Sequence, residues 1–366
     1  MVKSIRRIAV NTGGGDAPGL NAVIRAIVLA ALNRGWQVLG IHRGYEGLLD
    51  TSKIKQLNRD SVRGITHLGG TILGTTNKNS PFEFPTRTAD GATILVDRSD
   101  EVVANFKRLG IDALIAIGGD GSMRLAQRFF EKGIPVVGVP KTIDNDLHGT
   151  VITFGFDTAV TVATEALDRL HSTAEAHERV FVVEVMGRYA GWIALNSGVA
   201  STADVILIPE VPYDIDVVAQ KIMEREAEGR RFSIVVAAEG AHPKGGEMVT
   251  KAPQEAGREV QLGGIAEQVA RQLQTLTGKE CRAVVLGHLQ RGGTPTTFDR
   301  LTSLRFGAAA VRMVAAGQFG SMVALDPPDV RAVPLVEVTG RTRTVPTDGD
   351  TVATARDLGI CFGDVL

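Results

Sequence analysis

The stretches that decide the fold are Ala113–Ser122 (ALIAIGGDGS) and Val136–Asp146 (VVGVPKTIDND). Each begins with a short apolar run, which is typical of a buried parallel strand, and then becomes polar. The residues between them, Ser122–Lys132, have helical spacing, and Gly133 ends that helix. In open α/β sheets, ligands bind outside the carboxyl ends of the strands. The glycines, aspartates, lysine and threonine that gather there suit a metal-bound polyphosphate and a hydroxyl group that loses its proton.

Length, charge and cysteine content exclude several classes of protein. The 366 residues allow two or three domains of about 150 residues each, and the net charge of −1 argues against nucleic-acid or membrane binding by bulk charge. Cys281 and Cys361 have no close cysteine neighbour, so neither a disulfide framework nor a zinc site is indicated. No apolar run approaches the ~18 residues of a membrane span, and Met1–Arg7 leads into a strand rather than a signal peptide. The sequence therefore predicts a cytoplasmic protein without nucleic-acid or membrane partners.

The chain opens with a strand, a glycine-rich loop and a helix. Ile8–Val10 is followed by Gly13–Gly19 (GGGDAPG), and Leu20–Asn33 has apolar residues at helical spacing. Backbone N–H groups and the helix dipole suit a phosphate at such a loop, although a tight structural turn would use the same residues. A dinucleotide site is not indicated, because Pro18 stands where the fingerprint requires glycine. The P-loop pattern is also missing, since the only Gly-Lys pair, Gly278-Lys279, is followed by glutamate.

Strands and helices continue to alternate, and successive strands end in polar residues. These strand ends are Asp120, Lys141–Asp146, Met186–Arg188, Glu239, His288 and Arg291. The repetition predicts an α/β protein with two doubly wound, Rossmann-like domains, mainly parallel sheets and an active site in the cleft between the domains. We expect residues 1–156 plus about 289–345 to form one domain, and 157–288 plus the C-terminal segment to form the other.

Three local features complete the structural expectations. Ser99 is predicted to cap a helix whose first turn contains Asp100 and Glu101. The polar stretch Lys244–Arg258 is predicted to be a loop, and Val333–Val338 to be a strand of the tail.

Five motifs follow one another along the chain. They are GGDAPGLN at 14–21, GGDGS at 118–122, PKTIDND at 140–146, VEVMGR at 183–188 and LGHLQRGG at 286–293. In order and spacing they resemble the phosphofructokinase family over about residues 5–320. The resemblance implies transfer of a phosphoryl group to the 1-hydroxyl of fructose 6-phosphate by a homo-oligomer, either a dimer or a tetramer. It further implies that the first domain binds the nucleotide and the second binds fructose 6-phosphate.

Phosphoryl transfer depends on charge neutralisation and in-line positioning, and the motif residues match these needs. Asp120 is placed to hold Mg²⁺ that the donor phosphates carry. Asp144 is expected to be the general base for the sugar hydroxyl, with Thr142 and Asp146 orienting it or binding the transferred group. Arg188 is expected to stabilise the charge that develops during transfer. The residues expected at the donor are Gly15, Asn77, Lys78, Gly119, Asp120, Gly121 and Ser122.

The sugar-phosphate contacts follow from the resemblance. Besides Thr142, Asp144 and Arg188, it assigns to the sugar within one subunit Met186, Gly187, Glu239, His288 and Arg291. It assigns Arg179 and Arg282 to the 6-phosphate bound by a neighbouring subunit. Simpler alternatives are that His288 is a satisfied core histidine, that Glu239 forms an ion pair at a strand end, and that Asp144 and Asp146 form an Asx-type turn.

Two positions carry information about the donor, and they disagree. In the family, Gly121 accompanies ATP because a side chain there would occupy the space of the α-phosphate and nucleoside, whereas Lys141 is common in pyrophosphate-using relatives. Many ATP-using members also have arginine where Asn77 stands, and Lys78 or Lys141 would supply the missing charge. We predict ATP, because steric exclusion is decisive while a lysine near phosphates is compatible with either donor. Pyrophosphate is the alternative.

The remaining sequence features concern regulation and two alternative functions. Arg25 and Arg59 match two arginines of the family's bacterial effector site, but Leu29 replaces a third, so allosteric control has partial support and no particular effector is predicted. The segment beyond about residue 320 resembles the tails of the mixed-donor branch. Among enzymes, an alternative is another kinase with the Gly-Gly-Asp-Gly motif that acts on NAD or a lipid, but such a kinase would lack the pair Asp144 and Asp146. From another class, the alternative is a catalytically inactive sugar-phosphate sensor.

Overall fold

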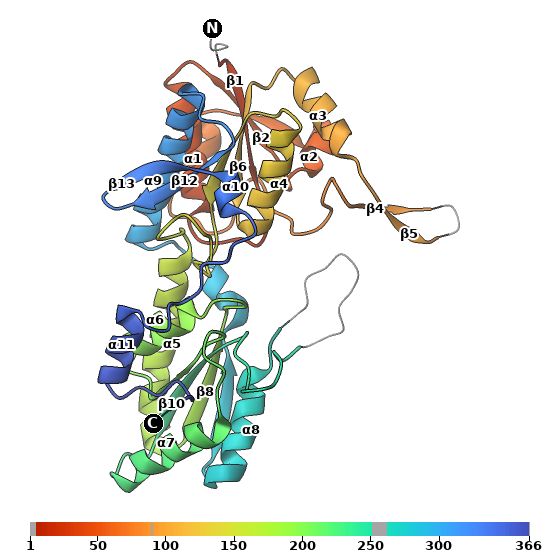
Figure 1. Cartoon of the computed structure of the whole chain (residues 1–366). Coiled ribbons are helices and arrows are strands. Elements are labelled where there is room, and N and C mark those ends of the chain that lie inside the picture. The colour runs from red at the N-terminus through yellow and green to blue at the C-terminus, as the bar shows by residue number, and fades with distance from the viewer. Residues whose placement is uncertain (1–4, 89–90, 251–261, 366) are drawn as a thin grey trace. The chain divides into compact units, whose positions relative to one another are not determined.

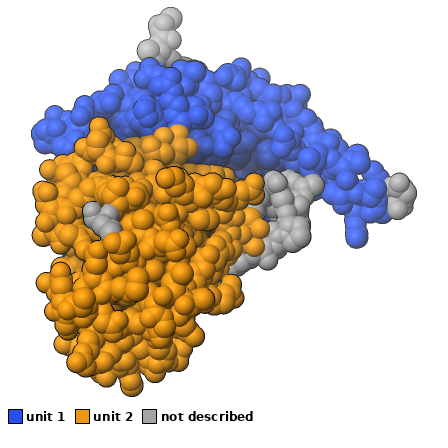
Figure 2. Space-filling model, turned by 60° about the horizontal axis from the view of Figure 1, so that its bottom comes forward, with its two compact units in different colours: residues 1–142, 147–155, 291–341 blue, residues 143–146, 156–290, 342–366 orange. Residues whose placement is uncertain are grey.

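The computed structural model describes residues 5–88, 91–250 and 262–365. Two compact units divide the chain (Figure 2): unit 1 comprises residues 1–142, 147–155 and 291–341, and unit 2 comprises 143–146, 156–290 and 342–366. The borders near 155 and 290 lie close to those expected from the sequence. The sequence placed two short segments in the first domain, 143–146 and 342–345, but both belong to unit 2. They are hydrogen-bonded to each other.

Unit 1 is built on a seven-stranded sheet. Its strands are β1 Arg7–Thr12, β2 Gln37–Ile41, β3 Ile54–Leu57, β6 Ala113–Gly118, β7 Val136–Pro140, β12 Ser321–Asp326 and β13 Asp329–Pro334. They are arranged in the order β13-β12-β7-β6-β1-β2-β3, and the strands from β12 to β2 are parallel to their neighbours. The edge strands β3 and β13 are antiparallel. Strands β6 and β7 are buried along their whole length, as their continuous apolar runs predict.

Helices cover both faces of this sheet (Figure 1). On one face, α1 (Leu20–Leu32) and α9 (Thr297–Ala315) pack side by side over Ile8, Val10 and Ile115. The other face, which includes Ala9 and Leu114, is covered by α2 (Glu46–Leu49), α3 (Ser99–Arg108), α4 (Asp120–Glu131) and α10 (Leu335–Val338). Successive strand residues point to opposite faces, so two covered faces require apolar residues throughout. A two-stranded hairpin, β4 (Phe84–Arg87) and β5 (Thr93–Val96), is separate from this sheet.

Unit 2 contains a four-stranded sheet whose strands are all parallel. The strands are β8 Val180–Val185, β9 Val205–Leu207, β10 Ser233–Ala238 and β11 Cys281–Val285, in the order β11-β8-β10-β9. On one face lie α5 (Phe156–His177) and α6 (Trp192–Ala200), and α7 (Ile215–Ala227) and α8 (Ile265–Thr277) lie on the other. The C-terminal helix α11 (Asp350–Asp357) packs against α6. Two mainly parallel α/β units confirm the predicted fold class.

Two local expectations are wrong. Helix α3 begins at Ser99, but its start is ordered by Asp97, whose Oδ1 accepts the N–H of Ser99 at 2.8 Å. The predicted strand Val333–Val338 ends at Pro334, after which the chain forms the short helix α10. Pro334 has no N–H for a further ladder hydrogen bond, and its φ of −55° suits a helix start.

The predicted loop Lys244–Arg258 lies, from residue 251 onward, outside the described residues. Among the helices that the structure describes, none is long and apolar enough to cross a membrane.

Candidate active site

Three neighbouring strand ends form what we call the carboxyl edge of unit 1: the ends of β1, β6 and β7 with the residues that follow them. The N–H of Gly13 donates to Ile117 at 2.9 Å, and the N–H of Lys141 donates to Gly118 at 2.9 Å. These bonds continue the parallel ladder past the strand ends. The structure thereby brings together the glycine loop, the GGDGS motif and Lys141, as the sequence predicted.

Ser122 explains why glycine is needed at two positions of this edge. A methyl group on Gly13 would lie 2.7 Å from Ser122 Oγ, and one on Gly118 would lie 2.1 Å from the same atom. The Ser122 side chain thus packs where β1 and β6 end. Gly15 is constrained from another direction, because its methyl group would lie 2.9 Å from Arg291 Nη1.

A second loop lies against the glycine loop. The N–H of Gly14 donates to Thr76 at 2.9 Å, and Thr75 Oγ1 donates to the carbonyl of Gly14 at 2.6 Å. Asn77 and Lys78 follow directly and are exposed, so this loop brings them to the carboxyl edge of unit 1. Thr75 and Thr76 are not among the site residues predicted from the sequence, although they lie in the same small-residue loop as Asn77 and Lys78. Their position next to Asn77 in a loop rich in small residues was the available signal.

Asp120 is the first residue of α4 and is placed where the helix dipole favours negative charge. Its carboxylate pairs with Arg124 at 2.6 Å and is 31% exposed, so it is accessible from solvent. Within the described residues, no group of three or more His, Cys, Asp or Glu side chains could hold a metal ion. A single carboxylate nevertheless fits Mg²⁺, which proteins usually hold by one or two carboxylates together with substrate phosphates and water.

The two residues that carry the donor question differ in their surroundings. Apart from its chain neighbours and the backbone of its own helix, a methyl group on Gly121 would meet no described atom within 4 Å, so the chain leaves this position open. Lys141 is buried, with 3% of its surface exposed, and its Nζ donates to the carbonyl of Gly15. Its ammonium group therefore lies inside the glycine loop.

Arg291 also lies at the carboxyl edge of unit 1, although the resemblance assigns it to the sugar. Its Nη1 donates to the carbonyl of Asp16 at 3.1 Å, and the residue belongs to unit 1. This places its guanidinium group beside Gly15.

The motif 140–146 continues from Lys141 into a loop with alternating burial. Ile143, Asn145 and Leu147 are buried, whereas Asp144 and Asp146 are half-buried. The carbonyl of Thr142 accepts a hydrogen bond from Thr153 Oγ1 at 2.7 Å. Thr142 belongs to unit 1, and Asp144 and Asp146 belong to unit 2.

The carboxyl edge of unit 2 brings together the residues that follow β8 and β10. The N–H of Glu239 donates to Val185 at 2.8 Å, and the N–H of Gly240 donates to Gly187 at 3.0 Å. Gly187 has a φ of +136°, which favours glycine. A methyl group on Gly240 would lie 1.9 Å from the carbonyl oxygen of Arg188, so Gly240 permits this close approach. Gly240 has no sequence signal beyond its position after Glu239, and we did not predict it.

His288 joins the same edge through the short 3₁₀ helix η3 (Gly287–Arg291) that follows β11. Gln290, which is fully buried, fixes this helix by accepting the N–H of Met186 at 3.4 Å. His288 itself is exposed, so the alternative of a buried core histidine is wrong.

Arg179 and Arg282 lie at the opposite, amino end of the unit 2 sheet. Arg179 precedes β8, Arg282 is the second residue of β11, and both pair with Glu280. The hydrogen bond from Arg179 holds the pKa of the Glu280 carboxyl below its usual value. A strand of this length spans about 20 Å, so these two arginines are far from Glu239 and His288 within one chain.

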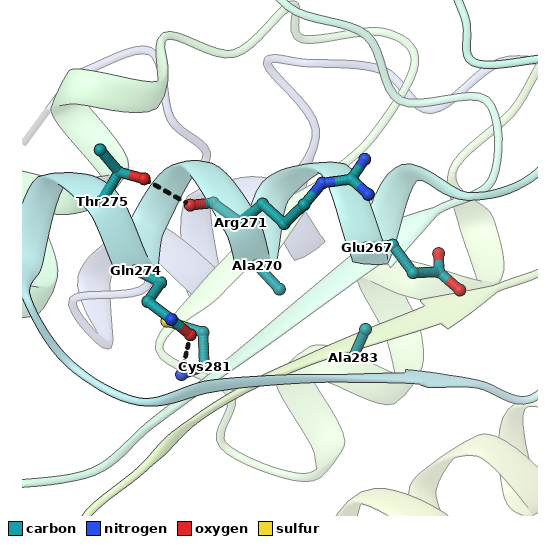
Figure 3. A pocket seen from close by; sticks show the side chains of 7 residues that line it. All are labelled: Glu267, Ala270, Arg271, Gln274, Thr275, Cys281 and Ala283. Carbon is teal, nitrogen blue, oxygen red and sulfur yellow. Dashed lines mark hydrogen bonds between the residues drawn. The ribbon is translucent and has the colours of Figure 1, made fainter.

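A surface hollow lies between α8 and β11 (Figure 3). Its lining includes Glu267, Arg271, Gln274 and Cys281. Gln274 Oε1 accepts the N–H of Cys281 at 3.4 Å. None of the predicted donor or sugar residues lines it.

Comparison with known proteins identifies the family. The family model described as Phosphofructokinase matches residues 7–314. An ATP-dependent 6-phosphofructokinase of Chloroflexus aurantiacus is 53% identical over 366 residues, which cover 100% of both chains. The crystal structure of Pichia pastoris phosphofructokinase in the T-state matches at a TM-score of 0.79 and 32% identity, covering 98% of this chain and 37% of that one. This chain therefore belongs to the phosphofructokinase family, and the resemblance of its motifs is confirmed.

Relatives of similar identity use different donors. A pyrophosphate–fructose 6-phosphate 1-phosphotransferase of Amycolatopsis methanolica is 49% identical over 344 residues, 93% of this chain and 96% of its own. The Chloroflexus relative, named as ATP-dependent, is 53% identical. Overall identity therefore separates relatives named for the two donors poorly.

Proposed function

We propose that this chain is an ATP-dependent 6-phosphofructokinase. It transfers the γ-phosphoryl group of ATP to the 1-hydroxyl of D-fructose 6-phosphate and releases fructose 1,6-bisphosphate and ADP, a step of glycolysis. Family membership supports the reaction, and the open position at Gly121 is the observation that carries the choice of donor.

The fold of the chain does not explain the glycine at position 121. Glycine inside a helix costs about 0.5–1 kcal/mol relative to alanine. Apart from its chain neighbours and the backbone of its own helix, a methyl group at Gly121 would contact no described atom within 4 Å, so packing of the chain gives no reason for glycine there. We infer that the requirement comes from the bound donor, which occupies the space in front of α4.

Pyrophosphate remains the second candidate because of Lys141. Its buried ammonium group adds a positive charge beside Gly15, which suits a compact, highly charged donor. The same charge also suits the β- and γ-phosphates of ATP, and it compensates for Asn77, where many ATP-using members have arginine. Lys141 therefore distinguishes the donors less sharply than Gly121 does.

The reacting groups have complementary roles. Asp144 accepts the proton of the 1-hydroxyl as that oxygen forms its bond to the γ-phosphorus, and the bond from the γ-phosphorus to the bridging oxygen of ADP breaks. Arg188, held by the contact between Gly187 and Gly240, stabilises the charge on the transferred group. Thr142 and Asp146 orient the transferred group and the general base. Asp120 would hold Mg²⁺, which when bound neutralises charge on the donor phosphates.

We further propose that sugar binding needs more than one subunit. Met186, Glu239 and His288 gather at the carboxyl edge of unit 2, whereas Arg179 and Arg282 lie at its amino end. This separation supports the assignment of the two arginines to the 6-phosphate held by a neighbouring subunit of a dimer or tetramer. We place the enzyme in the cytoplasm.

A coupled assay that follows fructose 1,6-bisphosphate, run with each donor and Mg²⁺, tests the proposal. We expect turnover with ATP, and turnover with pyrophosphate alone would overturn the donor. Asp144→Asn should lower kcat by about 10²–10⁴-fold while fructose 6-phosphate binding stays near that of the wild type. If the variant kept kcat within about tenfold, Asp144 would not be the general base.

A further inference from the structure

The tail segment 342–345 lies directly against the loop that carries Asp144. The backbone N–H of Arg343 donates to the carbonyl of Asp146 at 2.7 Å. Its side-chain Nη1 donates to the carbonyl of Asn145 at 3.0 Å. One residue thus binds two consecutive carbonyl groups of the loop, although it lies 198 residues from Asn145 in sequence.

The other side of the tail segment is anchored near Arg188. The carbonyl of Arg343 accepts Trp192 Nε1–H at 2.9 Å, and its guanidinium carbon lies 4.2 Å from the centre of a Trp192 ring. Two residues further on, the N–H of Val345 donates to Glu210 Oε1 at 2.7 Å, and Glu210 also accepts the N–H of Gly191 at 3.1 Å. Trp192 begins α6 directly after the turn that contains Arg188. The tail therefore bridges the loop of Asp144 and the turn of Arg188.

The loop needs such support because its backbone is strained. Asn145 has a φ of +52°, a left-handed conformation that is unfavourable for residues other than glycine, though asparagine tolerates it best. Strained backbone conformations persist only where surrounding contacts fix them. Asn145 is buried, and Arg343 holds the carbonyl groups of this residue and the next.

We propose that Arg343 is a positioning residue for phosphoryl transfer. With Trp192 and Glu210 it fixes the backbone of the loop that carries Asp144 and Asp146 in register with the turn that carries Arg188. The effect of Arg343 on kcat rests on the proposed function, whereas its effect on the position of the loop at 143–146 does not. It also gives the tail beyond residue 320 a role.

Loss of the Arg343 side chain removes the bond to the carbonyl of Asn145 and the contact with the Trp192 ring, and it should affect kcat more than substrate binding. A displacement of about 1 Å at a reacting group costs on the order of 10²-fold in rate. We expect Arg343→Ala to lower kcat about 10- to 100-fold and to change KM for fructose 6-phosphate by less than about threefold. Both variants keep the backbone bonds of residue 343. Arg343→Lys also keeps the charge but not the planar group that stacks on Trp192, so its kcat should be intermediate.

Arg356 provides a matched control in the same tail. It also lies over an aromatic ring, 5.0 Å from the centre of Phe362, and pairs with Asp364 at 2.6 Å. Arg356→Ala thus removes a comparable set of contacts without touching residues 143–146, and it should leave kcat unchanged. If Arg343→Ala does not fold, Trp192→Phe serves instead, because it keeps an aromatic ring and removes the indole N–H that bonds the carbonyl of Arg343.

Hydrogen–deuterium exchange of the amides of residues 143–147 gives a readout that needs no activity. Exchange should be faster in Arg343→Ala than in the wild type and unchanged in Arg356→Ala. The inference is overturned if Arg343→Ala keeps both wild-type exchange and kcat within about twofold, or if Arg356→Ala causes the same losses. A wild type without turnover would instead refute the proposed function, and the exchange experiment would still decide whether Arg343 positions the loop.

Discussion

Replacing Gly121 with alanine separates what the fold requires from what the donor requires. Gly121 is the second residue of α4, and a methyl group there would meet no described atom within 4 Å apart from its chain neighbours and the backbone of that helix. Removing a glycine from a helix stabilises it by about 0.5–1 kcal/mol. For a unit of this size, the expected rise in Tm is about 1–4 °C.

The same methyl group should impair use of ATP. If the donor occupies the space in front of α4, the added group is forced against it, and such overpacking costs about 1–3 kcal/mol. We expect kcat/KM for ATP to fall about 5- to 150-fold, with KM for fructose 6-phosphate unchanged. Gly121→Asp adds a second carboxylate beside Asp120, and its loss with ATP should be larger.

Urea unfolding and the coupled assay measure these two effects on the same preparation. Gly133→Ala is the control, because that position is equally open but has a φ of +86°. It should lose about 1–2 kcal/mol of stability and keep its kcat. A destabilised Gly121→Ala would mean that packing requires glycine at 121. Unchanged kcat/KM for ATP would mean that the donor does not occupy the space beside residue 121. Either result would refute the proposal that the bound donor requires glycine at this position.

Three other features predict measurable effects. A methyl group on Gly240 would lie 1.9 Å from the carbonyl oxygen of Arg188. Gly240→Ala should therefore lower the free energy of unfolding by about 1–3 kcal/mol and reduce kcat. Wild-type values for both quantities would contradict this contact. Burial raises the pKa of Glu210 above its ordinary value of 4.5, so the folded chain keeps a proton that the unfolded chain releases. This residue therefore makes the free energy of unfolding fall as pH rises from 4.5 through the folded-state pKa. Glu210→Gln should remove that part of the slope in urea unfolding, and an identical slope would count against it. Burial also raises the pKa of the Cys281 thiol to about 11, so about one thiol in a thousand is ionised at pH 8. Because the thiolate is the reactive form, iodoacetamide should label Cys281 far more slowly in native than in unfolded protein.

The sequence by itself determined the features that depend on neighbouring residues. The apolar runs Ala113–Ile117 and Val136–Val139 predicted buried parallel strands, because strands covered on both faces must be apolar throughout. Polar residues directly after these strands predicted which side chains share the carboxyl edge. The motifs were local as well, and they were sufficient to identify the family.

Contacts between distant segments were decided only by the tertiary structure. Arg343 holds a carbonyl 198 residues away, and Gln290 accepts an N–H 104 residues away. Such pairs leave no periodicity and require no particular residue types in the intervening chain, so single-sequence patterns do not reveal them. Gly121 shows the same division. The sequence supplied a glycine in a phosphate motif, but only the packed chain shows that no described neighbour requires it, which makes the donor the physical reason we propose for it.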